Sequence, residues 1–317
     1  MLTVYNCLVD EHDLRLVVLA ALVCAIASFA ALSLLHHVRR STGYMRAVWL
    51  TVSAISTGFG IWATHFVAML AYSPAIQNAY SVPLTSLSLV AAIVLTGVGL
   101  AVAVSSKFRG GTWIGGGLVG GGIAVMHYTG MAAFEVQGRI IWDLPLVTAS
   151  IVLGAVIGAA ALPVGLRADS LKWKLSGALL LTLAICSHHF TAMGAASLIP
   201  DPTISISDTA LPSGWLAIAV AVASAIILML ALAGVALEMR DRRRGELENA
   251  RMRGLANAAI EGLVVCEGDK IITVNDSFSA LAGRPAGAIV GTNLEQHFAE
   301  EVIRLRLWDR PNNAVEG

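Results

Sequence analysis

The stretch "AVMHYTGM", residues 124–131, decides the fold, because it lies in a run from 110 to 134 that contains no Asp, Glu, Lys or Arg. His127 in this run must find a partner or lie neutral in hydrocarbon, and either state costs free energy unless the protein gains something from it. Polar side chains in such surroundings are functional by default. The stretch therefore predicts an apolar helix with a functional histidine.

Composition gives the setting of this helix. The chain has 317 residues, of which 56% are hydrophobic and 13% charged, and its mean hydropathy is +0.74. These values are typical of a membrane protein, so we expect a lipid bilayer as its surroundings and no nucleic acid as a partner. The four cysteines are widely scattered and predict neither a disulfide framework nor a zinc ribbon.

Seven stretches are long enough to cross the hydrocarbon core of a bilayer, which takes about 20 helical residues. The predicted fold class is an all-α integral membrane bundle of seven transmembrane helices. Three two-helix repeats and one additional helix make up this bundle. The predicted spans are 14–35, 47–72, 84–104, 112–134, 146–166, 175–198 and 215–238.

Charge predicts the orientation of the bundle. Acidic residues precede the first span, where a cleaved signal peptide would carry positive charge, so we expect the N-terminus to stay outside. Most Lys and Arg residues up to Arg244 fall in alternate loops or at the end of the last span. The positive-inside rule then places the C-terminus in the cytoplasm.

A repeat of 62 residues relates three of the predicted spans. The stretches "WATHFVAM" (62–69), "AVMHYTGM" (124–131) and "CSHHFTAM" (186–193) align on one histidine each, and a methionine follows four positions later. Pro83 and Pro145 keep the same period, and each opens the next span. The repeating unit is therefore a pair of helices.

This spacing predicts a metal site. Residues four apart share a helical face, and the three helices run outward, so the side chains are expected at one depth, about 10 to 13 Å below the outer surface. Neutral imidazoles and thioethers suit copper(I), whereas three histidines also suit zinc with an open fourth position. The candidate ligands are His65, Met69, His127, Met131, His189 and Met193.

These residues resemble the MHYT domain, a bacterial seven-helix membrane sensor module named for a tetrapeptide that here is residues 126–129. The resemblance covers residues 10–240 and implies a copper site at the outer side of the bacterial inner membrane. Such a site would sense oxygen, carbon monoxide, nitric oxide or redox state. The family pattern has Met before each His; here Met126 keeps it, while Thr64 and His188 occupy the other two places. Met126 thus joins the candidate ligands, and so does His188, although it points about 100° away from His189.

Other features of the sequence favour structural roles. The run "WIGGGLVGGGIAV" (113–125) contains overlapping pairs of small residues four apart, which predict close packing of this helix against its neighbours. His36 and His37 adjoin Arg39 and Arg40 at the inner end of the first span. They indicate an interfacial cluster rather than a haem site.

Beyond Arg244 the composition becomes that of a soluble protein. The charged stretch after the last span is expected to continue its helix. Residues 261–283 predict strand, Gly-Asp turn, strand and short helix. They resemble the start of a PAS domain, on Asn275, Phe278, Leu281 and Gly283. The predicted domains are 1–239, the MHYT-type sensor; 240–252, a signalling helix; and 253–317, an incomplete PAS-like region.

The predicted function is that of a signalling sensor, with no enzyme activity within this chain. Full-length relatives of such sensors carry cyclic-di-GMP output domains, whose signatures are absent from these residues. A separate protein, further C-terminal sequence or a partner in a homodimer would receive the signal. Two other classes stay open, a zinc-dependent membrane hydrolase and a copper transporter. Retinal sensing is disfavoured, because the last span lacks a Lys for a Schiff base.

Overall fold

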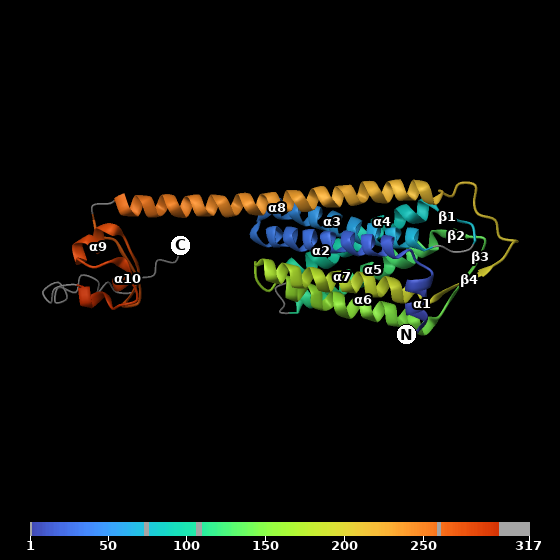
Figure 1. Cartoon of the computed structure of the whole chain (residues 1–317), viewed down its shortest axis with the longest axis horizontal. Coiled ribbons are helices and arrows are strands. Elements are labelled where there is room, and N and C mark those ends of the chain that lie inside the picture. Colours follow the sequence, from blue (N-terminus) through green and yellow to red (C-terminus); the bar gives the residue numbers. More distant parts are fainter. Residues whose placement is uncertain (1, 73–75, 106–109, 259–260, 298–317) are drawn as a thin grey trace. The chain divides into compact units, whose positions relative to one another are not determined.

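A computed structural model describes residues 2–72, 76–105, 110–258 and 261–297 (Figure 1). The chain divides into two compact units, which we call the membrane unit, Met1–Leu237, and the C-terminal unit, Glu238–Gly317. We describe each by itself. The last residues of the predicted incomplete PAS-like region, 298–317, lie outside the described residues.

Helices dominate the membrane unit. Six are long and apolar enough to cross a membrane, namely α2 (Leu14–Arg40), α3 (Gly43–Ala71), α4 (Val82–Ser105), α6 (Leu144–Gly165), α7 (Leu171–Met193) and the first part of α8 (Ser213–Ala258). They correspond to six of the seven predicted spans. A short helix that was not predicted, α1 (Leu2–Asp10), precedes them and packs against α7.

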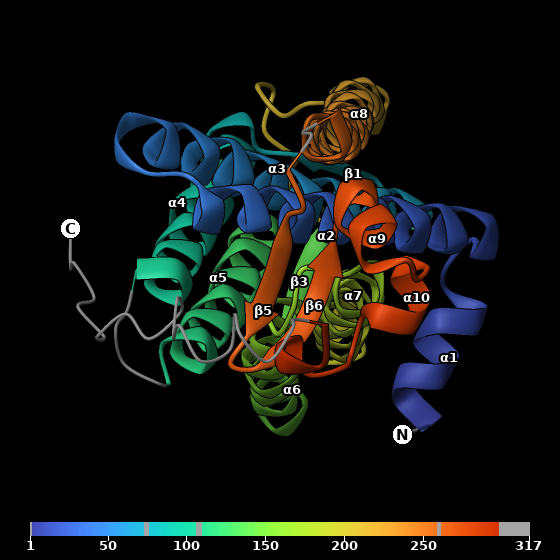
Figure 2. The ribbon, with the colours of Figure 1, turned by 90° about the vertical axis from the view of Figure 1, so that its left-hand side faces the viewer.

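The remaining predicted span corresponds to α5 (Gly111–Ala132), which is not among these six. Eight glycines, together with the polar residues of the histidine motif, make this helix less apolar than its neighbours. It packs between α4 and α6, as the view along the bundle in Figure 2 shows. The bundle therefore includes seven long helices, of which composition marks six as able to cross a membrane.

Glycines allow the close packing that the sequence predicts for α5. A Cβ atom added at Gly116 would lie 2.3 Å from the carbonyl oxygen of Gly158 on α6. One added at Gly120 would lie 2.4 Å from the carbonyl oxygen of Gly154. The backbones of α5 and α6 are therefore so close at these two positions that even a methyl side chain would not fit between them.

Short polar and proline signals set where the helices begin. Asp13 caps α2 by accepting a hydrogen bond from the backbone N–H of Arg15, and Asp143 caps α6 by accepting one from Leu146. Pro145 follows in the first turn of α6, and Pro83 lies in the first turn of α4, as predicted. Proline suits these positions because the first N–H groups of a helix have no partner within the helix.

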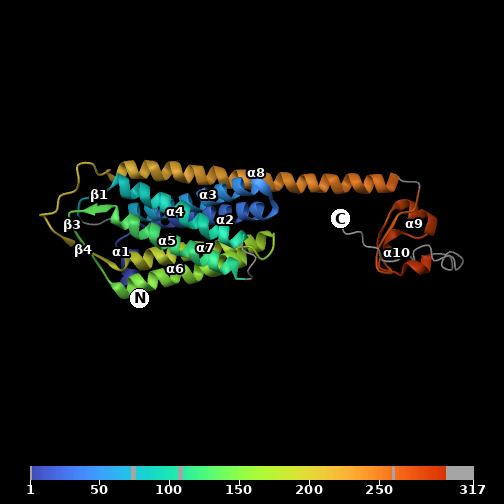
Figure 3. The same ribbon diagram turned by 180° about the vertical axis from the view of Figure 1, so that it is seen from behind.

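Four short strands join the ends of α3, α5 and α7, and the sequence analysis did not predict them. They are β1 (Asn78–Tyr80), β2 (Phe134–Val136), β3 (Gly138–Trp142) and β4 (Ala196–Pro200). β1 pairs with β2 and β3 with β4, both antiparallel, and all four lie at one end of the bundle (Figures 1 and 3). The predicted span 175–198 is wrong at its end, because α7 stops at Met193 and residues 196–200 pair with β3.

At the opposite end of the bundle, Asp169 lies close to two cationic side chains and one histidine. Its carboxylate lies 2.9 Å from Lys174 Nζ, 3.8 Å from His36 Nδ1, and in contact with Arg40. His36 Nε2 lies 2.9 Å from the carbonyl oxygen of Gly165 and is hydrogen-bonded to it. These ion pairs and this hydrogen bond connect the C-terminal end of α2 to the segment between α6 and α7.

The C-terminal unit contains the last part of α8, the hairpin of β5 (Val264–Glu267) and β6 (Lys270–Val274), and α9 (Asp276–Ala282), α10 (Ala286–Ile289) and the 3-10 helix η1 (Leu294–His297). The predicted order of strand, turn, strand and helix is confirmed. Gly268 in the turn has a φ of 62°, which glycine adopts readily. Ile271, Phe278 and Ile289 form the core.

Asn275 has the largest structural role among the four residues of the PAS-like motif. Its side-chain oxygen accepts hydrogen bonds from the N–H groups of Phe278 and Leu263, so it caps α9. Its amide nitrogen donates to the carbonyl oxygen of Ala256 in the last turn of α8, at 2.7 Å. Gly283 ends α9 with a φ of 63°, whereas Leu281 is exposed.

Candidate metal centre

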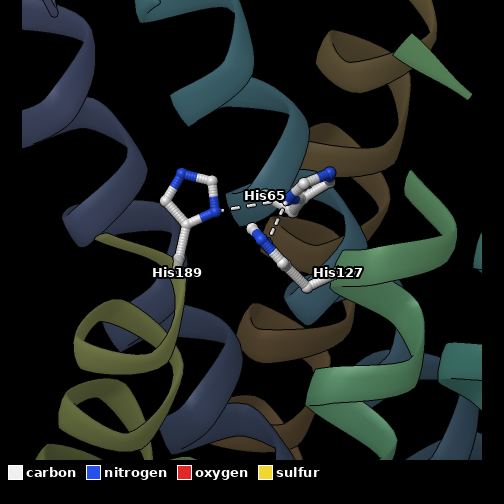
Figure 4. Close-up of side chains that lie close together, drawn as sticks. All are labelled: His65, His127 and His189. Carbon is white, nitrogen blue, oxygen red and sulfur yellow. Dashed lines mark hydrogen bonds between the residues drawn. The ribbon is translucent and has the colours of Figure 1, made fainter. Parts of the chain in front are cut away.

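Three histidine side chains meet inside the membrane unit, as Figure 4 shows. His65 comes from α3, His127 from α5 and His189 from α7, and each is at least 97% buried. The ring centroids are 4.8 to 5.2 Å apart, and every pair of rings is close to perpendicular. The structure thus brings together the three imidazoles that the 62-residue repeat aligns.

Two short contacts between these rings join Nδ1 atoms. His65 Nδ1 lies 3.1 Å from His127 Nδ1 and 3.2 Å from His189 Nδ1. A ring nitrogen of a neutral imidazole is either a donor or an acceptor, so His65 Nδ1 cannot donate to one neighbour and accept from the other. The three Nε2 atoms are buried and have no hydrogen-bond partner among the described residues. Such a set of nitrogens is poorly satisfied by protons alone.

These residues fit a shared metal ion. Zn–N bonds are about 2.0–2.1 Å long, so tetrahedral nitrogen ligands lie about 3.3–3.4 Å apart, close to the two measured separations. One ring nitrogen from each histidine lies within 4.8 Å of the others. A cation among them would give all three lone pairs a partner. The described part of the chain adds no carboxylate or thiol to this group.

The repeat also explains why the rings have room. A Cβ atom added at Gly130 on α5 would lie only 2.4 Å from His65 Nε2. Gly130 stands three residues after His127, where the other two repeats have Ala68 and Ala192. A small residue at this position in all three copies was the signal that the sequence analysis missed.

The histidines lie closer to the helix ends than predicted. His65 precedes the end of α3 by six residues, His127 that of α5 by five and His189 that of α7 by four, whereas the predicted depth of about 10 to 13 Å corresponds to seven to nine residues. At 1.5 Å per residue the site is about 6 to 9 Å from these ends. The prediction was wrong because it extended α7 into residues that form β4.

The four candidate methionines are all buried. Their exposed fractions are 1% or 2%, and they belong to the same hydrophobic core. Burial is equally consistent with packing, for which methionine is a common choice. Ligation by the thioethers therefore stays a prediction for Met69, Met126, Met131 and Met193.

The two residues that replace methionine before the histidine have other contacts. Thr64 Oγ1 donates a 2.7 Å hydrogen bond to the carbonyl oxygen of Gly60 in its own helix. His188 Nδ1 donates to the carbonyl oxygen of Ser150 on α6, at 2.8 Å, and its ring centroid is 5.1 Å from that of His127. His188 thus adjoins the three-histidine group without belonging to it.

Comparison with known proteins supports a signalling family. Residues 58–116 and 120–178 each match the MHYT family, described as "Bacterial signalling protein N terminal repeat". The two matches contain His65 and His127, whereas the copy with His189 lies beyond them. No solved structure matches the chain.

Several curated proteins are similar to this chain. An "Uncharacterized signaling protein" of Caulobacter vibrioides is 38% identical over 289 residues, which are 91% of this chain and 35% of that protein. The "Bifunctional diguanylate cyclase/cyclic di-GMP phosphodiesterase MucR" of Pseudomonas aeruginosa is 33% identical over 67% of this chain and 32% of its own length. The "Cyclic di-GMP phosphodiesterase NbdA" of the same organism is 37% identical over 67% of this chain and 28% of its own length.

The chain spans about a third of the length of these curated relatives. Within that third, two consecutive family matches cover the helices that hold His65 and His127. The described residues form a bundle rich in apolar helices. The chain is a membrane protein and belongs to the MHYT family of bacterial signalling proteins.

Proposed function

We propose that the membrane unit is a sensor that binds one soft metal ion through His65, His127 and His189. The observation that carries this proposal is the meeting of three buried imidazole nitrogens, two pairs of which are 3.1 and 3.2 Å apart. Copper(I) is our first choice, because neutral imidazoles and thioethers suit it, and zinc is the second. The methionine four positions after each histidine is buried in the core, and copper(I) accepts thioether ligands.

The protein's own part is to hold three neutral rings in fixed orientations and to exclude water from them. Bound copper would supply a one-electron couple and an open position for a diatomic gas. Binding of a gas, or a change in the charge of the ion, would alter the forces on α3, α5 and α7, the helices that carry the three rings. This would make the site a sensor of redox state or of a gas, as the first part of a signalling protein requires.

For the topology, we propose that α5 crosses the membrane together with the six more apolar helices. The N-terminus is then outside the bacterial inner membrane and the site lies near the outer leaflet, as the distribution of Lys and Arg predicts. The signal would leave through α8, a single helix from Ser213 to Ala258. The PAS-like start follows this helix, and a partner in a homodimer is a further candidate receiver.

The output that we propose is a change in cyclic-di-GMP level. Support comes from MucR and NbdA, which are named as cyclic-di-GMP enzymes and are similar to this chain over 67% of its length. A hydrolase is less well supported, because the described residues place no carboxylate in the histidine group to act as a general base. A transporter would need ligands along the whole path, whereas these three lie at one level.

The test is metal analysis of the purified chain, with spectra before and after reduction. We expect one copper ion per chain, and we expect His127→Ala to lose most of it while the protein remains inserted, because only a ligand is removed. Thr64→Ala serves as the matched control next to the site, since its hydroxyl bonds its own helix. Equal copper in the wild type and in His127→Ala would contradict the proposal.

A further inference from the structure

His12 is a buried histidine that the repeat does not include. It lies between α1 and α2, and its side chain is only 6% exposed. An isolated bridge pairs it with Tyr72, and the N–H of Asp13 donates to the carbonyl oxygen of Ala71 at 2.9 Å. These backbone contacts hold His12 at the C-terminal end of α3. The three histidines lie towards the same end of the bundle.

The hydrogen bonds of His12 leave one nitrogen available. His12 Nδ1 lies 2.8 Å from the carbonyl oxygen of Cys7, which can only accept, so Nδ1 carries the proton. In the neutral ring Nε2 then has the lone pair, and it is buried without a partner among the described residues. Histidines that bind metals usually donate their second N–H to a carbonyl or carboxylate in this way.

The protonation states around His12 favour the same nitrogen. Burial lowers the pKa of His12, although the bond to Cys7 raises it, so the ring is neutral at pH 7. Burial, followed by the charge of Glu11, raises the pKa of the Cys7 thiol to about 12. The thiol therefore stays protonated. His12 Nε2, in contrast, keeps an uncharged lone pair that can bind a cation.

His12 also stands one aromatic ring away from the three-histidine group. Its ring centroid is 5.7 Å from that of Phe190, and Phe190 is 5.0 Å from His189. Tyr72 covers a second side of His12 at 5.2 Å. The ring of Phe190 thus lies between the ring of His12 and that of His189.

We propose that His12 is a loading ligand, which takes a soft monovalent cation at the loop end of the bundle and transfers it to the site formed by His65, His127 and His189. The transfer step rests on the proposed function, whereas the binding step does not. Among the described residues, no group of three His, Cys, Asp or Glu donors includes His12, so His12 offers an ion fewer ligands than the three-histidine group and should release it more readily. Fast exchange of this kind is what a transfer position requires.

The first experiment measures loading of the apo protein in detergent with copper(I), supplied anaerobically from an excess of a coloured chelator. We expect His12→Gln to slow loading by about tenfold or more and to leave the final copper content unchanged. Glutamine can still donate to the carbonyl oxygen of Cys7, so the local fold is kept. The matched control is His36→Gln, the same change at a buried histidine of the opposite end. Loading of His12→Gln at the wild-type rate would overturn the transfer role.

The second experiment separates binding at His12 from the proposed function. The probe is silver(I), followed by nitrogen-15 NMR of labelled histidines, with the resonance of His12 assigned by its loss in His12→Gln. We expect silver to shift His12 Nε2 in the wild type and in His127→Ala alike. If the wild-type three-histidine group bound no ion and His12 still shifted, the proposed function and the transfer step would be refuted, and binding at His12 would be upheld. Absence of the shift would overturn the inference.

Discussion

A single methyl group should be enough to disable the candidate metal centre. In Gly130→Ala the new Cβ atom would lie 2.4 Å from His65 Nε2, whereas non-bonded carbon contacts are normally about 3.5–4.0 Å. The ring must therefore retreat by about 1 Å. His65 is 2% exposed and packs against Phe66, with ring centroids 4.6 Å apart, so the ring has little space in which to move.

The expected effect on stability combines two opposite terms. Overpacking of a filled core costs about 1–3 kcal/mol. Alanine is favoured over glycine inside a helix by about 1 kcal/mol, which offsets part of that cost. We therefore expect the free energy of unfolding to fall by about 0 to 2 kcal/mol. The effect on metal binding should be larger, since a 1 Å shift misaligns His65 Nδ1 with both of its neighbours.

The measurements are copper affinity, by competition with a chelator, and thermal unfolding in detergent. We expect copper affinity of Gly130→Ala to fall by about 10 to 100-fold, the usual effect of disturbing the support of a ligand. Gly121→Ala is the matched control, because its added Cβ atom meets nothing within 4 Å on the same helix. If Gly130→Ala and Gly121→Ala bound copper equally well, the reasoning from the His65 contact would be refuted.

Three further predictions concern the rest of the chain. Asp169→Asn should lower the free energy of unfolding by about 2–3 kcal/mol, because the ion pair of the buried Lys174 is weakened; thermal unfolding tests this, and Asp201→Asn should change less, because the ion-pair partner of Asp201 is the exposed Arg139. Asn275→Ala should cost about 1 kcal/mol for the cap of α9 and more for the lost bond to α8, and hydrogen exchange should rise in residues 261–283. Insertion of one to three residues near Gly245 should change the output of a full-length protein with a helical period, since each residue turns α8 by about 100°; constant output would exclude a mechanical relay.

The long helices were predictable because the bilayer imposes their length and composition. The starts of α2, α4 and α6 agree with the predicted spans within two residues, and Asp13 and Pro145 mark two of them. The strands at the loop end were not predicted. They have three to five residues each, too short for an alternating pattern to stand out, and their stability depends on pairing between segments distant in sequence.

The meeting of the three histidines could be predicted from the period of the repeat, whereas the shape of the site could not. Equal spacing places His65, His127 and His189 at similar heights, but which nitrogen faces inward depends on packing between helices. The room left by Gly130 is likewise a property of two helices, α3 and α5, and no single helix reveals it. His12 escaped notice because it belongs to no repeat and its contacts with Tyr72 and Phe190 join segments distant in sequence.

Each of the three repeats contributes one imidazole to the candidate metal centre, but the residue before the histidine differs among the repeats. At the position before the histidine, Thr64 bonds its own helix, Met126 is buried in the core and His188 bonds α6. An ion held by three equal nitrogens would therefore meet a different neighbour on each helix. A gas or redox change at the ion would then disturb α3, α5 and α7 unequally. The strand pair β1–β2 links the ends of α3 and α5, and the pair β3–β4 links those of α5 and α7, so unequal forces on these helices can tilt one against another.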